Sequence, residues 1–162
     1  MARRKIYVET SVISYLTSRP SKTIIGAAHQ QLTLAWWEMR GQYDLMISEV
    51  VMRECGAGDA DSAKKRLEVV RNLPMLLITG EAIKIAEDLI KEKIVPLKAI
   101  EDALHIAIAT AHNMDYLVTW NCRHIANPEI QRGIASYLGR IGTALPFICT
   151  PEELLGEENH EG

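Results

Sequence analysis

Carboxylates and amides follow several hydrophobic segments of the chain, and these residues define its possible chemistry. Glu9 comes directly after the strand-like segment Lys5–Val8, and Asn121 comes two residues after a segment that ends at Thr119. Asp102 stands at the start of a long apolar helical segment. Oxygen ligands of this kind suit Mg²⁺ or Mn²⁺, whereas zinc would require histidine or cysteine. The residue types therefore indicate a site for a hard divalent cation and a phosphate-containing substrate.

Among these candidate residues, Asp102 has the most informative sequence surroundings. Its helical segment is apolar on nearly every side, and a buried carboxylate is costly unless something pairs with it. This favours a ligand or substrate-site role, although an acid in the first turn of a helix is also stabilised by the helix dipole. Glu49 and Glu54, on the helix expected after the second strand, are both candidates for a further acidic ligand.

Other reaction classes lack their motifs. His105 and His112 lie seven residues apart, but no H-E-x-x-H pattern or third nitrogen ligand accompanies them, so both are interpreted as packed or surface histidines. Gly56-Ala-Gly58 follows a helix and has no third glycine, which excludes a dinucleotide fingerprint. No G-x-S-x-G or Walker sequence is present, so acyl hydrolysis and ATP cleavage are not favoured.

The elements that must position these residues alternate along the chain. We expect strands at 5–8, 43–48, 75–79, 116–119 and 146–149, and helices at 24–40, 49–55, 80–93, 100–113 and 128–138. This alternation predicts an α/β fold with a mainly parallel central sheet of four to five strands. Functional sites of open parallel sheets lie at the carboxyl ends of the strands, where Glu9 and Asn121 are expected.

Length and charge limit the function classes. With 162 residues, the chain is expected to form one domain over residues 1–151, followed by an acidic C-terminal tail at 152–162. The whole chain has 18 basic and 21 acidic residues, a net charge of −3, which excludes a polybasic nucleic-acid binder. The tail holds five glutamates and no Lys or Arg, so residues 1–151 have 18 basic against 16 acidic residues, or +2. A nuclease is therefore compatible with the charge of the domain.

Cysteine usage and hydropathy indicate a cytoplasmic location. The three cysteines, Cys55, Cys122 and Cys149, are widely spaced and form no C-x-x-C pair, which is typical of a reducing compartment. No apolar stretch approaches the ~18 residues of a membrane span, and the first residues lack an apolar signal core.

Four segments of the chain, taken in order, are similar to one known family. They are IYVETSVI from Ile6, ISEVVMRE from Ile47, EDALHIAIA from Glu101 and LVTWN from Leu117. The chain resembles the PIN-domain nucleases over roughly Ile6 to Pro151, and within them the VapC-type toxins of type II toxin–antitoxin systems. The resemblance implies a three-layer α/β/α fold. It also implies a metal-dependent endoribonuclease that hydrolyses RNA phosphodiester bonds.

The resemblance further implies which residues act. The Mg²⁺ or Mn²⁺ ligands and catalytic residues would be Glu9, Glu54, Asp102 and Asn121. Supporting residues would be Thr10, Ser11, Thr119 and Glu101, and candidates for contacting RNA would be Arg53, Arg123 and His124. The implied partners are RNA, a small antitoxin protein and a second copy of the chain in a homodimer, without a membrane. The Trp36-Trp37 pair offers apolar mass for the core or for that dimer interface.

Two residues depart from the family pattern. Glu9 stands where the family usually has aspartate, and its extra methylene shifts the carboxylate by roughly a bond length, which matters for the strict geometry of Mg²⁺. Asn121 is a neutral residue at the fourth acidic position. Both changes predict weaker metal binding. They also favour an alternative function, a catalytically weakened PIN-fold scaffold that binds RNA or another protein.

Overall fold

The computed structural model describes residues 2–156, which fold around a single parallel sheet. The strands are β1 (Lys5–Val8), β2 (Asp44–Ser48), β3 (Met75–Leu76), β4 (Tyr116–Val118) and β5 (Phe147–Cys149). The helices are α1 (Thr10–Thr17), α2 (Ile24–Glu38), α3 (Glu49–Cys55), α4 (Ala60–Val70), α5 (Gly80–Lys91), α6 (Ile100–Ala111), α7 (Pro128–Arg140) and α8 (Pro151–Leu155). The predicted α/β fold is confirmed, and each pair of neighbouring strands is parallel.

The strand order creates a crevice in the middle of the sheet. The order is β3-β2-β1-β4-β5, so the chain runs outward from β1 in one direction through β2 and β3. It then returns to β4 on the other side of β1 and continues outward to β5. The connections that leave β1 and β4 therefore diverge at their carboxyl ends, which is where open parallel sheets bind ligands. Glu9 follows β1 and Thr119 follows β4, so both lie at this point.

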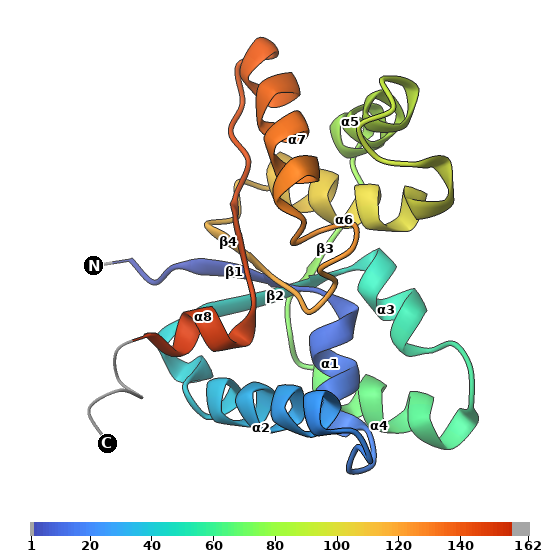
Figure 1. The fold of residues 1–162 in the computed structure, drawn as a ribbon, viewed down its shortest axis with the longest axis vertical. Coiled ribbons are helices and arrows are strands. Elements are labelled where there is room, and N and C mark those ends of the chain that lie inside the picture. The colour runs from blue at the N-terminus through green and yellow to red at the C-terminus, as the bar shows by residue number, and fades with distance from the viewer. Residues whose placement is uncertain (1, 157–162) are drawn as a thin grey trace.

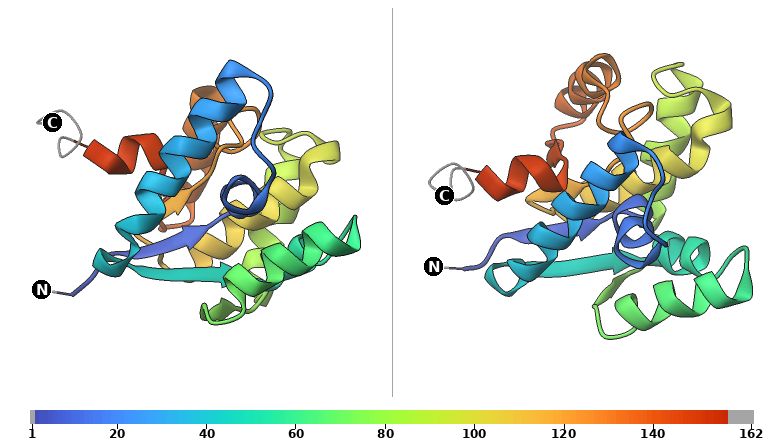
Figure 2. Two further views of the ribbon diagram at one scale, coloured as in Figure 1. Left: turned by 90° about the horizontal axis from the view of Figure 1, so that it is seen from below. Right: turned by 60° about the horizontal axis from the view of Figure 1, so that its bottom comes forward.

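Helices cover both faces of the sheet. In Figure 1, α5, α6 and α7 lie on one side of the strands, and α1, α2, α4 and α8 lie on the other. The contacts agree, because α5 packs on α6, while α1 packs on both α2 and α4, and α8 packs on α2. Figure 2 shows the same layers from below, with α2 running across the sheet. The expected three-layer α/β/α arrangement is present.

The central strand is buried on both sides. Ile6, Tyr7 and Val8 of β1 have no exposed surface, because β1 pairs with β2 and β4 and helices cover both of its faces. A strand in this environment is expected to be continuously apolar, and Tyr7 is the member that brings a polar atom into the core. Its hydroxyl must therefore find a partner inside the protein.

The third strand is shorter than predicted. Residues 75–79 were expected to form it, but β3 contains only Met75 and Leu76. Its ladder ends where Leu76 pairs with Ser48, because β2 ends at Ser48 and the chain continues into α3. Beyond the ladder, the backbone N–H of Ile78 donates to the Glu49 carboxylate at 2.7 Å.

The tryptophan pair lies partly in the core. Trp36 is fully buried, whereas Trp37 is half-buried and carries the Arg40 guanidinium 4.6 Å from its ring centroid.

At the C-terminal end, α8 contributes Leu155 to the core, and residues 157–162 of the expected tail lie outside the described residues. None of the helices described here is both long and apolar enough to cross a membrane.

Candidate active site

Glu9 is a buried carboxylate that the surrounding backbone and hydroxyl groups hold in place. It caps the N-terminus of α1, and its Oε2 accepts the backbone N–H of Ser11 at 3.1 Å. Its Oε1 accepts the hydroxyls of Ser11 and Thr119, each at 2.5 Å. Only 5% of the residue is exposed. A buried carboxylate of this kind is tolerated because three donors replace the water it has lost.

Glu54 is held by a different set of partners. It lies on α3, and its Oε1 accepts the Thr10 hydroxyl at 2.6 Å and is paired with His105 Nε2 at 2.7 Å. Burial alone would raise the pKa of Glu54, but the hydrogen bond and charge of His105, with help from Thr10 and Arg53, outweigh it and lower the pKa below its ordinary value. Glu54 is therefore ionised at neutral pH.

A chain of hydrogen bonds connects Glu54 with the core. His105 is fully buried on α6, and its Nδ1 lies 2.7 Å from the Tyr7 hydroxyl, which lies 2.7 Å from the Ser48 hydroxyl. Ser48 in turn caps α3 by accepting the N–H of Val51. The chain Ser48–Tyr7–His105–Glu54 thus joins β1, β2, α3 and α6 to one carboxylate.

The pKa values along this chain reflect the nearby acids. Burial would lower the pKa of His105, but the hydrogen bond to Glu54 and the charges of Glu9, Glu54 and Asp102 raise it above its ordinary value. Burial raises the pKa of Tyr7 well above its ordinary value, and the charges of Glu9 and Glu54 act in the same direction. The two shifts of Glu54 and His105 agree with each other, since each favours the charged form of its group.

Asp102 forms a second group with Asn121 and His124. Its Oδ1 accepts the side-chain amide of Asn121 at 3.0 Å, and its Oδ2 lies 3.1 Å from His124 Nδ1. The Asn121 carbonyl oxygen accepts the backbone N–H of His124 at 3.0 Å. In this arrangement Asn121 orients Asp102, while its own oxygen is already bound within the loop.

Thr119 connects the two groups. Its hydroxyl donates to Glu9 and accepts the backbone N–H of Asn121 at 2.9 Å. Ser11 adds a second link, because its hydroxyl accepts the backbone N–H of Trp120 at 2.8 Å. The loop after β4 is therefore tied directly to the start of α1, across the crevice of the sheet.

Three of these side chains could hold a metal ion. Glu9, Glu54 and His105 each have a ligand atom within 4.8 Å of the others. Both hydrogen bonds to Glu54 fall on Oε1, which leaves Oε2 without a hydrogen-bond partner among the described residues. A free carboxylate oxygen beside a second carboxylate is suitable for a hard divalent cation. The donor set therefore fits the expected Mg²⁺ or Mn²⁺.

The remaining candidate residues have other contacts. Glu49 binds the Ile78 amide and so does not join Glu9 and Glu54. Glu101, expected to support Asp102, forms an ion pair with Arg53, which was expected to contact RNA. Arg123 is exposed and has no ion pair among the described residues.

His105 and His112 were predicted to be packed or surface histidines, and the structure adds contacts of His105 that were not predicted. His105 is packed, as expected, and His112 lies 2.9 Å from the carbonyl of Leu77. The sequence analysis did not foresee that His105 binds Glu54, nor that Tyr7 and Ser48 extend this contact. A tyrosine inside an otherwise apolar central strand was the available signal, because its hydroxyl required a buried partner.

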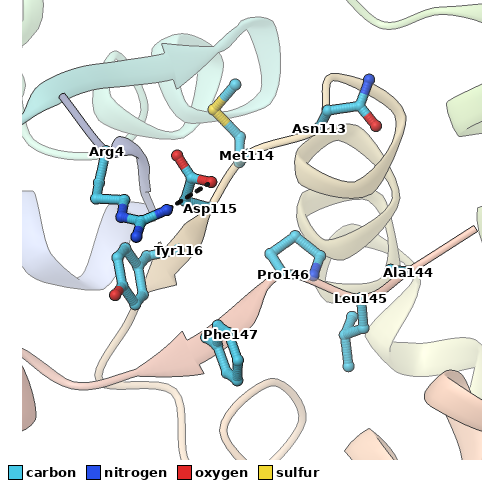
Figure 3. A pocket seen from close by; sticks show the side chains of 9 residues that line it. All are labelled: Arg4, Asn113, Met114, Asp115, Tyr116, Ala144, Leu145, Pro146 and Phe147. Atoms are coloured by element: carbon cyan, nitrogen blue, oxygen red, sulfur yellow. Dashed lines mark ion pairs between the residues drawn. The ribbon is translucent and has the colours of Figure 1, made fainter. Parts of the chain in front are cut away.

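A well-defined pocket elsewhere on the molecule does not belong to this site. Figure 3 shows it, with a volume of about 320 Å³, lined by Arg4, Asp115, Pro146 and Phe147 among others. Arg4 pairs with Asp115 there. Its residues precede or begin β1, β4 and β5, so the pocket lies at the amino ends of the strands, opposite the acidic residues.

The fold and the acidic groups define an α/β protein with a carboxylate site at the switch point of its sheet. The PIN domain family matches residues 6–126, and the chain belongs to this family. The match includes Glu9, Glu54, Asp102 and Asn121. No curated protein sequence matches the chain.

Two solved structures share the fold. VapBC2 from Rickettsia felis, bound to a DNA fragment from their promoter, has a TM-score of 0.54 and 16% identity, covering 74% of this chain and 89% of its own. VapC20 from Mycobacterium tuberculosis, described as a sarcin-ricin loop cleaving toxin, has a TM-score of 0.52 and 14% identity, covering 73% of this chain and 91% of its own. These likenesses support the PIN fold.

Proposed function

We propose that the protein is a Mg²⁺- or Mn²⁺-dependent endoribonuclease that hydrolyses RNA phosphodiester bonds. The observation that carries this proposal is the meeting of Glu9 and Glu54 at the switch point, with Asp102 close enough for its charge to act on His105. Carboxylates in such a group repel one another, and a divalent cation removes that repulsion. Membership of the PIN domain family supports the same reaction class.

The protein residues have separate tasks in this proposal. Glu9 and Glu54 hold the cation, with Asp102 as the third acid, and the cation supplies Lewis acidity and a water of lowered pKa for attack on the phosphate. Thr119 and Ser11 keep Glu9 in place, and His105 keeps Glu54 in place. Asn121 and His124 orient Asp102.

We also infer a biological setting. The chain would act in the cytoplasm as the toxin of a type II pair, as a homodimer that a small antitoxin neutralises. The two structures with the same fold carry names of this kind, since one is a VapBC complex and the other a toxin that cleaves the sarcin-ricin loop.

A second candidate is a PIN-fold scaffold that binds RNA or protein without cleaving it. One observation favours it: the side-chain oxygen of Asn121 accepts the His124 amide, so one of its two lone pairs is not available to a cation. The scaffold and the nuclease differ in one measurable respect, which is cleavage.

The test measures cleavage of single-stranded RNA with Mg²⁺, with Mn²⁺ and with EDTA. We expect cleavage with either metal, none with EDTA, and a loss of at least about 100-fold in Asp102→Asn. Asp115→Asn is the matched control, because Asp115 lies at the opposite end of the strands, pairs with Arg4 and should leave the rate unchanged. No cleavage with either metal would favour the scaffold, and an unchanged rate in Asp102→Asn would contradict a nuclease that uses this acidic site.

A further inference from the structure

A polar groove lies between α1 and α4, near the acidic site. It has a volume of about 610 Å³ and is lined on the α1 side by Ser14 and Thr17, and on the α4 side by Lys65 and Arg66. The loop after α1 adds Arg19. The two helices pack on each other and lie side by side in Figures 1 and 2. The groove is thus a built feature of the fold between two ordered elements.

A row of hydroxyls along one face of α1 lies between the acidic site and the groove. Thr10, Ser14 and Thr17 are spaced four and three residues apart, which places them on the same side of the helix. Thr10 donates its hydroxyl to Glu54, whereas the other two line the groove. At a rise of 1.5 Å per residue, Ser14 lies about 6 Å and Thr17 about 10 Å along the axis from Thr10. A row of hydroxyls therefore leads from a candidate metal ligand into the groove.

Arg66 fixes the other wall close to the same ligand. Its guanidinium donates to the carbonyl of Cys55 at 3.0 Å and to that of Ala57 at 2.6 Å, just after Glu54 in the chain. Arg66 and Glu54 therefore flank the same residue, Cys55, one through a hydrogen bond to its carbonyl and the other as its neighbour in the chain.

The charges of the groove fit a polyanion. Lys65 and Arg19 have no ion pair among the described residues, so both cations are available to a ligand. Three cations, Arg19, Lys65 and Arg66, line the groove with two acids, Asp59 and Asp61, so its net charge is +1. Hydroxyls and cations together are the usual partners of phosphate oxygens. A positively charged groove that follows the backbone is how proteins bind single-stranded nucleic acid without sequence preference.

We propose that the groove between α1 and α4 binds the sugar–phosphate backbone of single-stranded RNA and leads it to the acidic site. The inference deepens the proposed nuclease function and rests on it for the identity of the ligand. Lys65 and Arg19 contact phosphates, and Ser14 donates a hydrogen bond to the same backbone, whereas the Thr17 hydroxyl already donates to the Ile13 carbonyl and can only accept. Recognition here is through charge, so it is largely independent of base sequence.

The test compares two neighbouring lysines on α4. Lys65 lines the groove, whereas Lys64 lines a shallow surface on another side of α4 with Leu67 and Arg71. Binding of a fluorescent single-stranded RNA is measured by anisotropy against salt concentration, in EDTA and in an Asp102→Asn background so that the RNA stays intact. Lys65→Ala should weaken binding about fivefold and reduce the slope of log K against log salt by about 0.7, the value for one phosphate contact on a single strand. Lys64→Ala should change neither quantity.

The possible results of this test distinguish failure of the groove proposal from failure of the proposed nuclease function. Equal effects of Lys65→Ala and Lys64→Ala would overturn the groove, while cleavage by the native protein would still support the nuclease. A Lys65-specific loss of binding without cleavage would support the groove and overturn the nuclease. Tighter binding of a duplex than of the single strand would overturn the groove, and absence of any RNA binding would overturn both. Urea unfolding of the two lysine variants checks that each is folded.

Discussion

Two neighbouring carboxylates in this protein are stabilised in different ways. Glu9 forms no ion pair among the described residues and relies on one amide and two hydroxyls, whereas Glu54 is paired with the His105 imidazole. The neutral donors around Glu9 bring no positive charge, and the single imidazole of His105 faces the charges of Glu9, Glu54 and Asp102. The site therefore keeps a net attraction for a cation, which is the electrostatic requirement of the proposed function.

Removal of the Tyr7 hydroxyl should weaken both the fold and the site. Tyr7→Phe leaves the ring in the core but removes the group that joins His105 to Ser48. We expect the free energy of unfolding to fall by about 1–3 kcal/mol, because His105 Nδ1 is left buried without a partner. Urea unfolding measures this, and Mn²⁺ binding by the same variant should be weaker because Glu54 is less firmly oriented.

Tyr116→Phe is the control for this change. Tyr116 is half-buried beside Phe147, and no hydrogen bond of its hydroxyl is recorded among the described residues. It should change stability by less than about 0.5 kcal/mol. Equal losses in the two variants would mean that the chain through Tyr7 contributes nothing specific.

Sequence reasoning found the residues of the site more readily than their contacts. Glu9, Asp102 and Asn121 could be proposed because strand ends and helix starts are visible in the hydrophobic pattern, whereas Glu54 was preferred to Glu49 through the family resemblance. The pairing of Tyr7 with His105 joins residues 98 positions apart, and no local pattern records such a contact. The pairing of Glu101 with Arg53 was missed for the same reason.

The elements themselves were largely predictable because each has its own local signals. Four helices are each capped by the side chain of the residue before them, namely Ser48, Asp59, Thr79 and Asn127. The burial of α6 matches its apolar sequence. The short β3 was not predictable, because its partner strand β2 ends at Ser48 and leaves the residues after Leu76 without a neighbouring strand. Propensity and periodicity describe a segment, whereas its partner in the sheet decides where it stops.

Helix α7 allows a test of packing within one element. Gly139 lies near its end, where an added Cβ would meet nothing within 4 Å, whereas a Cβ on Gly133 would lie 3.0 Å from Ile94 Cγ2. Gly139→Ala should stabilise the protein by up to about 1 kcal/mol, because alanine is the better helix former. Gly133→Ala should gain less or destabilise, because Ile94 must shift. Thermal unfolding compares them, and an equal gain at both positions would show that α7 does not pack closely on the segment around Ile94.

At the scale of the molecule, the charge is unevenly distributed. The net charge of −3 results from the glutamates after residue 151, while the domain before them has a charge of +2 and two of its acids, Glu9 and Glu54, meet beside the carboxyl ends of the strands. A weakly basic body with an acidic centre suits a polyanionic substrate that approaches through a cation. The net charge of the whole chain, −3, would by itself have argued against a polyanionic substrate.

Binding of a cation at that centre should stabilise the whole fold. Mn²⁺ at about 100 times its Kd adds ~2.7 kcal/mol if it binds only the folded state. For a chain of this size this is a rise in Tm of about 5–10 °C, and EDTA should reverse it. Glu9→Gln should remove most of the rise, whereas Asp115→Asn, at the other end of the strands, should keep it. An equal rise in Glu9→Gln would place the cation elsewhere.

The same rise in Tm should depend on pH in a definite direction. The pKa of Glu54 lies below its ordinary value, since the contacts with His105 and Thr10 outweigh the effect of burial. Its carboxylate therefore stays ionised, and available to Mn²⁺, into acid that would protonate a free glutamate. The Mn²⁺-dependent rise should persist as pH falls to the ordinary pKa of glutamate and be lost only below it, as Glu54 is protonated. Loss of the rise already near neutral pH would show that Glu54 is not the carboxylate that holds the cation.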